Sequence, residues 1–308
     1  MTFLSSSFIF LMYRFNSILI FYKQKTARAL LRAVQSYTLY LINKRMKNFK
    51  IALLALISIL AISCDNDDDD AMALTGSGEV SVTFDNGYAG NDLLLGTTNA
   101  ANSNGETLTV TRLSYIVSNF SLIDVDGNEY VFPKDDSYFI INQEADLDDI
   151  SLPNIPAGAY TTLKFGIGVD DEKYQQGGEG QGDLWTRAEE NNLTWSWTAG
   201  YKYINYEGTF TSATVTDETD FKVHLGRLGD QVNYEEVTLA LPTNVTVSDE
   251  MDSNIHLKID ASKILASIHN LLLSDQAVLM TDPEKAPLIA ENIATMFVVD
   301  HVHNGNGH

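Results

Sequence analysis

The residues of this chain that could bind a metal are its six histidines, all of which lie after residue 223: His224, His256, His269, His301, His303 and His308. His301 and His303 are separated by a single residue. In an extended segment alternate side chains face one way, so these imidazoles would share a face with their Cβ atoms about 7 Å apart, close enough for one metal ion. Asp300 could orient one of the two rings. The alternative is a flexible tail that binds metal only adventitiously.

The donor types favour copper. Cys64 is the only cysteine, so no thiolate cluster can bind zinc or iron–sulfur and no disulfide can form within the chain. Imidazole without thiolate suits copper, zinc or nickel, and the affinity order of divalent ions favours copper. Met296 could add a soft ligand for Cu(I), or it could simply belong to the core. We therefore predict copper as the ligand, with His301 and His303 as first candidates and His224 next. We expect the fold to bring these three histidines together at one site, close to an indole.

Two of the three tryptophans lie in one segment that precedes a strand histidine. Trp195 and Trp197 are two positions apart, so on a strand they share one face. In the predicted strand 221–226 the apolar residues share one face and His224 takes the other. An indole pair beside a histidine indicates a place for metal chemistry. The alternative is that the indoles fill a sandwich core and His224 is simply exposed.

The sequence carries no motif of a familiar enzyme class. It has no GxSxG elbow, P-loop, HExxH helix or dinucleotide fingerprint, and no CxxCH for attaching haem. The glycine-rich run 177–182 does not open a helix after a strand, so it does not predict phosphate binding. We therefore predict a binding protein rather than an enzyme.

Charge is distributed very unevenly along the chain. All 41 acidic residues but only 11 of the 20 basic residues lie after residue 63, so this part carries a formal charge of 11 − 41 = −30. Such a surface repels phosphate backbones and attracts cations, so nucleic acid is not an expected partner.

Residues 46–63 have the composition of an export signal. Residues 46–63 form a short basic stretch and an apolar run that ends at Cys64, which resembles a lipoprotein signal peptide and implies lipidation of that cysteine. The alternative is a free thiol in a membrane helix. We interpret residues 1–45 as a mis-annotated upstream extension, with translation starting at Met46. Residues 64–78 would form an acidic tether. These features predict an outer-membrane lipoprotein of the cell envelope, either periplasmic or surface-exposed.

Residues 79–304 are expected to form one β-rich domain. About ten short segments alternate apolar and polar residues between turn signals. The segment 107–125 is too long for an ordinary strand and should bend near 118–119. Helical apolar spacing predicts two helices, over 261–273 and 283–297. The prediction is a mostly β fold, an antiparallel β-sandwich (immunoglobulin-like or similar) with a short helical C-terminal appendage at about 261–297.

Several segments together resemble the MbnP family of copper-binding periplasmic or surface proteins. They are LSYIVSNFSL at 113–122, LPNIPAGAYTTLKFGIGVD at 152–170, the segment that contains the two tryptophans, FKVHLG at 221–226, and DHVHN at 300–304. The last of these is similar to the ending of lipoprotein members. The resemblance covers most of residues 79–260.

The resemblance implies a β-sandwich that binds copper through histidines. In some relatives a tryptophan is oxidised to kynurenine by a dihaem cytochrome c peroxidase-like partner and then helps to bind copper, and Trp195 or Trp197 would be the candidate by position. His224 matches a His-x-Gly segment of the family. The expected function is a lipid-anchored copper-binding protein that works with such a partner. The alternative is a surface lipoprotein that binds glycan or protein through an exposed platform of Trp185, Trp195, Trp197 and Tyr201.

Overall fold

The computed structural model describes residues 74–196, 200–280 and 282–305. The upstream extension 1–45, the signal peptide 46–63, Cys64 and most of the tether therefore lie outside the described residues, as do Trp197 and His308. Within the described ranges, no helix has the length and apolar composition needed to cross a membrane.

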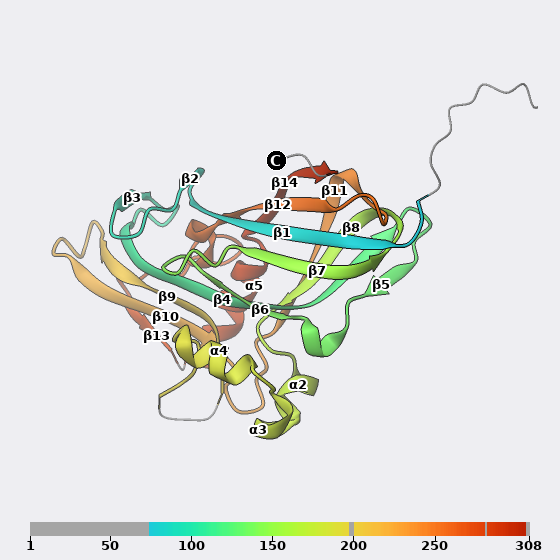
Figure 1. Cartoon of the computed structure of the whole chain (residues 1–308). Helices are drawn as coiled ribbons and strands as arrows, with labels where there is room; N and C mark the ends of the chain where they lie inside the picture. The colour runs from blue at the N-terminus through green and yellow to red at the C-terminus, as the bar shows by residue number, and fades with distance from the viewer. Residues whose placement is uncertain (1–73, 197–199, 281, 306–308) are drawn as a thin grey trace, which may run out of the picture. The chain divides into compact units, whose positions relative to one another are not determined.

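The first of two sheets carries the C-terminal strand at its edge (Figure 1). Its order is β14 (Phe297–Asn304), β12 (Ser253–Asp260), β1 (Ser77–Tyr88) and β2 (Asn91–Asp92), with β7 (Asp149–Pro156) also paired to β1. Strands β1 and β12 run parallel, although they are far apart in sequence. Each turns alternate apolar residues toward the core, so every second side chain of these strands lies on the outer face.

The second sheet is larger and is built around one long strand, β4 (Thr107–Asp124). Its main order is β11 (Glu235–Val247), β8 (Gly158–Ile167), β4, β9 (Lys202–Thr211), β10 (Thr219–Gly226) and β13 (Val278–Leu279), and β3 (Thr98–Ala101), β5 (Glu129–Val131) and β6 (Tyr138–Asn142) also pair with β4. The predicted bend is confirmed, because the pairing of β4 with β8 shifts between Ser118 and Ser121 and Asn119 has a φ of 53°. A bulge of this kind lets an 18-residue strand bend.

The two sheets face each other across the main hydrophobic core. Phe165 lies at its centre, with ring centroids 6.1 Å from Phe84, 5.1 Å from Phe297 and 5.4 Å from Phe120. These rings come from both sheets, so they join the two layers; truncating such a phenylalanine typically costs about 3–5 kcal/mol. The predicted mostly β sandwich is confirmed.

Three short helices cover the other face of the second sheet: α2 (Asp171–Gln175), α3 (Gly177–Gly180) and α4 (Leu184–Glu190) (Figure 1). Leu184 and Ala188 of α4 pack on Ile116 of β4 in a second, smaller core. The sequence does not predict these helices, because the glycine-rich run 177–182 carries no helical apolar spacing. Helix α2 is capped by Asp170, whose carboxylate accepts a hydrogen bond from the backbone N–H of Lys173.

The prediction of a helix over 261–273 is wrong. Only a short 3₁₀ turn, η2 (Ala261–Ile264), forms within 261–273, and the remainder is irregular. Side chains distant in sequence pair with the backbone of this segment. Asn292 donates hydrogen bonds to the carbonyls of Ile264 and His269. Glu106 accepts hydrogen bonds from the N–H groups of Leu273 and Ser274. These buried hydrogen bonds replace the internal ones of a helix. The second predicted helix is present but shorter, as α5 (Ala286–Ala294), and it is followed directly by β14.

Candidate metal centre

Strand pairing places His256 directly beside His301. The apolar residues Ile255, Leu257 and Ile259 of β12 are buried, so His256 lies on the outer face of the sheet. Its partner across the ladder on β14 is His301. The two imidazoles are stacked, with ring centroids 4.7 Å apart and planes 11° apart. The ring of His303 meets the ring of His301 edge-on, with centroids 4.5 Å apart.

A β-bulge at Asp300 is the reason that His301 reaches this face. Val299 pairs with Leu257 and His301 pairs with His256, which leaves Asp300 as an extra residue on β14. In an unbroken ladder His301 would pair with Ile255 and turn toward the core, because side chains alternate. The extra residue reverses the alternation and places two β14 residues opposite one histidine.

The carboxylate of Asp300 holds the cluster together. It accepts a hydrogen bond of 2.8 Å from Nδ1 of His301, and Lys258 lies 3.4 Å from its other oxygen. The hydrogen bond from His301, helped by the positive charge of Lys258, lowers the pKa of Asp300, which is therefore ionised at neutral pH. This bond leaves Nε2 of His301 free to bind a ligand.

These groups meet the chemical requirements of a metal site. One donor atom each from His256, Asp300 and His301 lies within 4.8 Å of the others. Nδ1 of His256 is buried and has no hydrogen-bond partner among the described residues. Ligands that share one ion lie roughly 3–4 Å apart, so small side-chain rotations would close the set. All the donors project from one face of a sheet, so solvent could reach an ion bound there from the other side.

The structure does not bring His224 to this cluster. His224 is on β10, in the second sheet, whereas His301 and His303 are on β14 in the first. The prediction that these three histidines converge is therefore wrong, and the residue that joins the terminal pair is His256. Nothing in the sequence singles out His256 as a ligand, because alternation places it on the outer face but does not say which strand lies beside it.

His224 belongs to a separate, buried site. It is only 7% exposed, and its Nε2 lies 2.7 Å from a carboxylate oxygen of Glu207. Burial, together with the positive charge of Lys202, lowers the pKa of His224 to about 4 and outweighs the opposing effect of Glu207. The imidazole is therefore neutral at pH 7 and donates Nε2–H to Glu207, while Nδ1 has no partner among the described residues. The ring of Trp195 lies 6.0 Å away.

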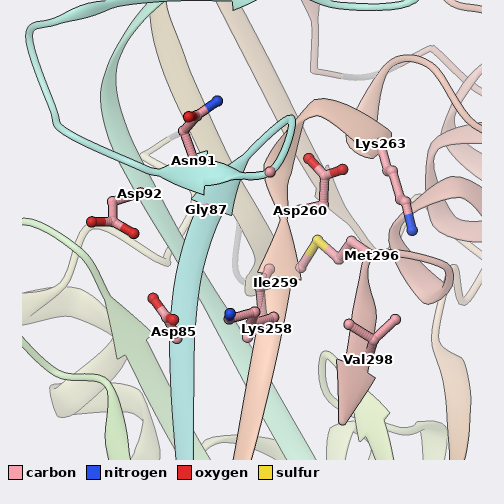
Figure 2. Close-up of a pocket in the computed structure, with 11 residues that line it drawn as sticks. Asp85, Gly87, Asn91, Asp92, Lys258, Ile259, Asp260, Lys263, Met296 and Val298 are labelled. Carbon is pink, nitrogen blue, oxygen red and sulfur yellow. The ribbon is translucent and has the colours of Figure 1, made fainter. Parts of the chain in front are cut away.

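Three other sequence candidates are buried side chains. Met296 is fully buried in the main core and lines a cavity of about 270 Å³ on the outer side of the first sheet, beside Lys258 and Val298 (Figure 2). Trp195 and Tyr201 are 6% and 2% exposed. The predicted exposed aromatic platform is therefore not formed by these two residues.

Comparison with known proteins identifies the family. The MbnP family model matches residues 77–281, which is more than half of the chain. Among solved structures, "MbnP from Methylosinus trichosporium" is similar with 13% identity and a TM-score of 0.43, over 75% of this chain and 99% of that one. No curated protein sequence matches significantly. His256 lies within the matched range, whereas Asp300, His301 and His303 lie beyond its end. This chain belongs to the MbnP family.

Proposed function

We propose that this protein binds copper at the cluster of His256, Asp300, His301 and His303, and that it captures or hands on the ion rather than catalysing a reaction. The observation that carries the proposal is the pairing of His256 with His301 around the carboxylate of Asp300. Two strands separated by 36 residues meet there, and an extra residue in one of them turns its histidine outward.

The donor set favours copper over the other common metals. Imidazole nitrogens and one carboxylate suit Cu(II), which binds such sites more tightly than zinc or nickel. The family name of the matched model points the same way, since the resemblance to MbnP proteins implies copper binding through histidines. The strongly acidic surface raises the local concentration of any cation.

The one-sided arrangement of the donors suits capture and release. The side chains of β12 and β14 that would hold the ion lie on one face of the sheet, so a bound ion would stay accessible to a ligand from solution. This cluster lies at the surface: the side chain of His301 is 42% exposed and that of Asp300 is 35% exposed. An exposed site of this kind exchanges its ion more readily than a closed one.

The cellular setting that we propose follows from the N-terminus. Lipidation of Cys64 after cleavage of 46–63 would tether the acidic domain to the cell envelope, as an outer-membrane lipoprotein. There it would meet copper that enters the periplasm or reaches the cell surface.

The buried site around His224 is a second candidate for copper chemistry. A neutral imidazole whose Nε2–H is held by Glu207 presents Nδ1 as a lone-pair donor, which is the arrangement of a metal-ligating histidine with its orienting carboxylate. Trp195 beside it is the described indole that a dihaem peroxidase-like partner would oxidise, if this chain follows those relatives.

Metal titration of the purified protein tests the proposal. We expect one equivalent of Cu(II) to bind in competition with a chromophoric chelator, and the double variant His256→Ala/His301→Ala to lose it. His269→Ala is the matched control, because His269 is a surface histidine paired with Glu291 at 2.5 Å on a different part of the fold. If copper binding survives the double variant and disappears with His224→Gln, the site is the one around His224. If binding survives both changes, neither candidate site holds copper.

A further inference from the structure

A pocket on the helical side of the second sheet is not used by the proposed copper chemistry. It has a volume of about 590 Å³ and lies between α2, the α3–α4 region and Tyr201. The helices lie on the opposite side of this sheet from β12 and β14 (Figure 1). Three aromatic side chains line it, Tyr174, Trp185 and Tyr201, with Gln175 and Thr186 beside them.

The aromatic walls of the pocket are held in place by a second layer of contacts. The side-chain amide of Gln181 accepts a hydrogen bond of 3.0 Å from the hydroxyl of Tyr201 and donates to the carbonyls of Lys173 and Gly177. Trp185 meets the ring of Tyr201 edge-on, with centroids 5.4 Å apart. The pocket is therefore formed before any ligand arrives, which lowers the entropic cost of binding.

The third wall is fixed in a similar way. The guanidinium of Arg227 lies over the ring of Tyr174 at 4.6 Å, and Arg227 is in turn paired with Asp171. A cation–π contact supported by an ion pair restrains the tyrosine ring.

Several neutral hydrogen-bonding groups in the pocket lack a partner. Within the ranges that the structure describes, no hydrogen bond satisfies the indole N–H of Trp185 or the hydroxyls of Tyr174 and Thr186, and the side-chain carbonyl of Gln175 accepts none. Glycines at 177 and 182 have φ values of 69° and 59°, and a Cβ added at either would meet no atom within 4 Å, so the rim is open.

These features define the chemistry of the ligand. Among the described residues that line the pocket no side chain is charged, and the chain after residue 63 carries a net charge of −30, which disfavours anions. Aromatic faces bind apolar C–H surfaces, while unpartnered N–H, O–H and C=O groups bind hydroxyls. A sugar ring offers both surfaces and no charge. We propose that this pocket binds a neutral saccharide, at a site independent of copper.

A glycan array that carries neutral and anionic oligosaccharides, probed with the purified full-length protein, tests the proposal. The expected result is binding restricted to neutral glycans, confirmed in solution by a change in tryptophan fluorescence. Trp185→Ala should weaken that binding by about tenfold or more. Trp185→Phe should weaken it less, because it keeps one aromatic ring against Tyr201 while losing the indole N–H and part of the ring surface.

Tyr130→Ala is the matched control, since Tyr130 is a half-buried aromatic residue on β5, outside the pocket. Circular dichroism establishes that each variant is folded. The proposal is overturned by an array without neutral binders, by binding to anionic glycans alone, or by equal affinity in the wild type and both Trp185 variants. Copper titration of the same variants should be unchanged, so a result that refutes the saccharide pocket can be told apart from one that refutes the copper site.

Discussion

His256 and His301 lie directly opposite each other on β12 and β14, with their rings stacked 4.7 Å apart, and the extra residue Asp300 is what turns the second ring outward. Neither histidine would form a metal site alone. The candidate metal site therefore depends on a tertiary feature, the bulged pairing between β12 and the C-terminal strand β14.

Deletion of Asp300 tests the bulge itself. Removing one residue restores strict alternation, so His301 should turn toward the core and copper affinity should fall as far as in His301→Ala. Asp300→Ala keeps the extra residue and both histidines on the outer face and loses only the carboxylate, so its affinity should fall less than in the deletion, by about 10–100-fold. The two affinities are compared by chelator competition. Equal affinities for the deletion and Asp300→Ala would show that the bulge has no role.

Lys258 should weaken the site. Its ammonium group lies 3.4 Å from Asp300, where it competes with a metal ion for the carboxylate and repels the ion. Lys258→Met should therefore raise copper affinity several-fold, and the gain should shrink at high salt because the groups are exposed. Lys164→Met makes the same charge change beside Glu129 on the second sheet and is the matched control. An equal gain in both variants would indicate a general charge effect.

The buried His224 predicts a pH dependence of stability in metal-free buffer. Its pKa is about 4 in the folded protein, against about 6.5 in an unfolded chain. As the pH falls from 6.5 to 4 the unfolded chain takes up a proton that the folded protein excludes, so the free energy of unfolding decreases. The full loss is on the order of 3 kcal/mol, and it does not grow below pH 4.

Other groups titrate in the same window, so the informative quantity is the difference between wild type and His224→Gln. Glutamine can still donate to Glu207 but does not titrate. Urea unfolding at a series of pH values should show a shallower decline for the variant between pH 6.5 and 4. Parallel curves would contradict a buried, neutral His224.

Asn292 should be one of the most sensitive polar positions for stability. It is fully buried, accepts from the N–H of His269 at 2.8 Å and donates to two carbonyls of the 261–273 segment. Asn292→Ala leaves those groups unpaired, and we expect a loss of about 3 kcal/mol. Glu291→Ala, next to it and exposed, should cost under about 1 kcal/mol. Chemical denaturation measures both, and similar midpoints would contradict the role of Asn292.

Local patterns in the sequence predicted much of the sandwich. Alternating apolar residues are required wherever a strand has one buried face, so β1, β8 and β12 could be recognised without knowing their neighbours. The bend in β4 followed from its length alone. The same reasoning failed at 261–273, where the spacing of Ile264, Leu265 and Ile268 resembles a helix. There the hydrogen bonds of Asn292 and Glu106, which are distant in sequence, decide the conformation.

The candidate metal site was predictable only in part. The spacing of His301 and His303 indicated that their rings would lie together, and the structure places them in contact. The contribution of His256 depends on which strand pairs with β12 and in what register, and no local pattern encodes either. The prediction that His224 would join the terminal histidines was wrong for the same reason, because the sequence of a strand does not say which sheet the strand joins.

The most direct test of the copper site is pulsed EPR of the Cu(II)-loaded protein, which counts the imidazole rings bound to the ion. The account predicts at least two bound imidazoles in the wild type and the loss of one in His256→Ala, with no change in His269→Ala. A spectrum that His256→Ala leaves unaltered would contradict the claim that β12 and β14 together hold the metal.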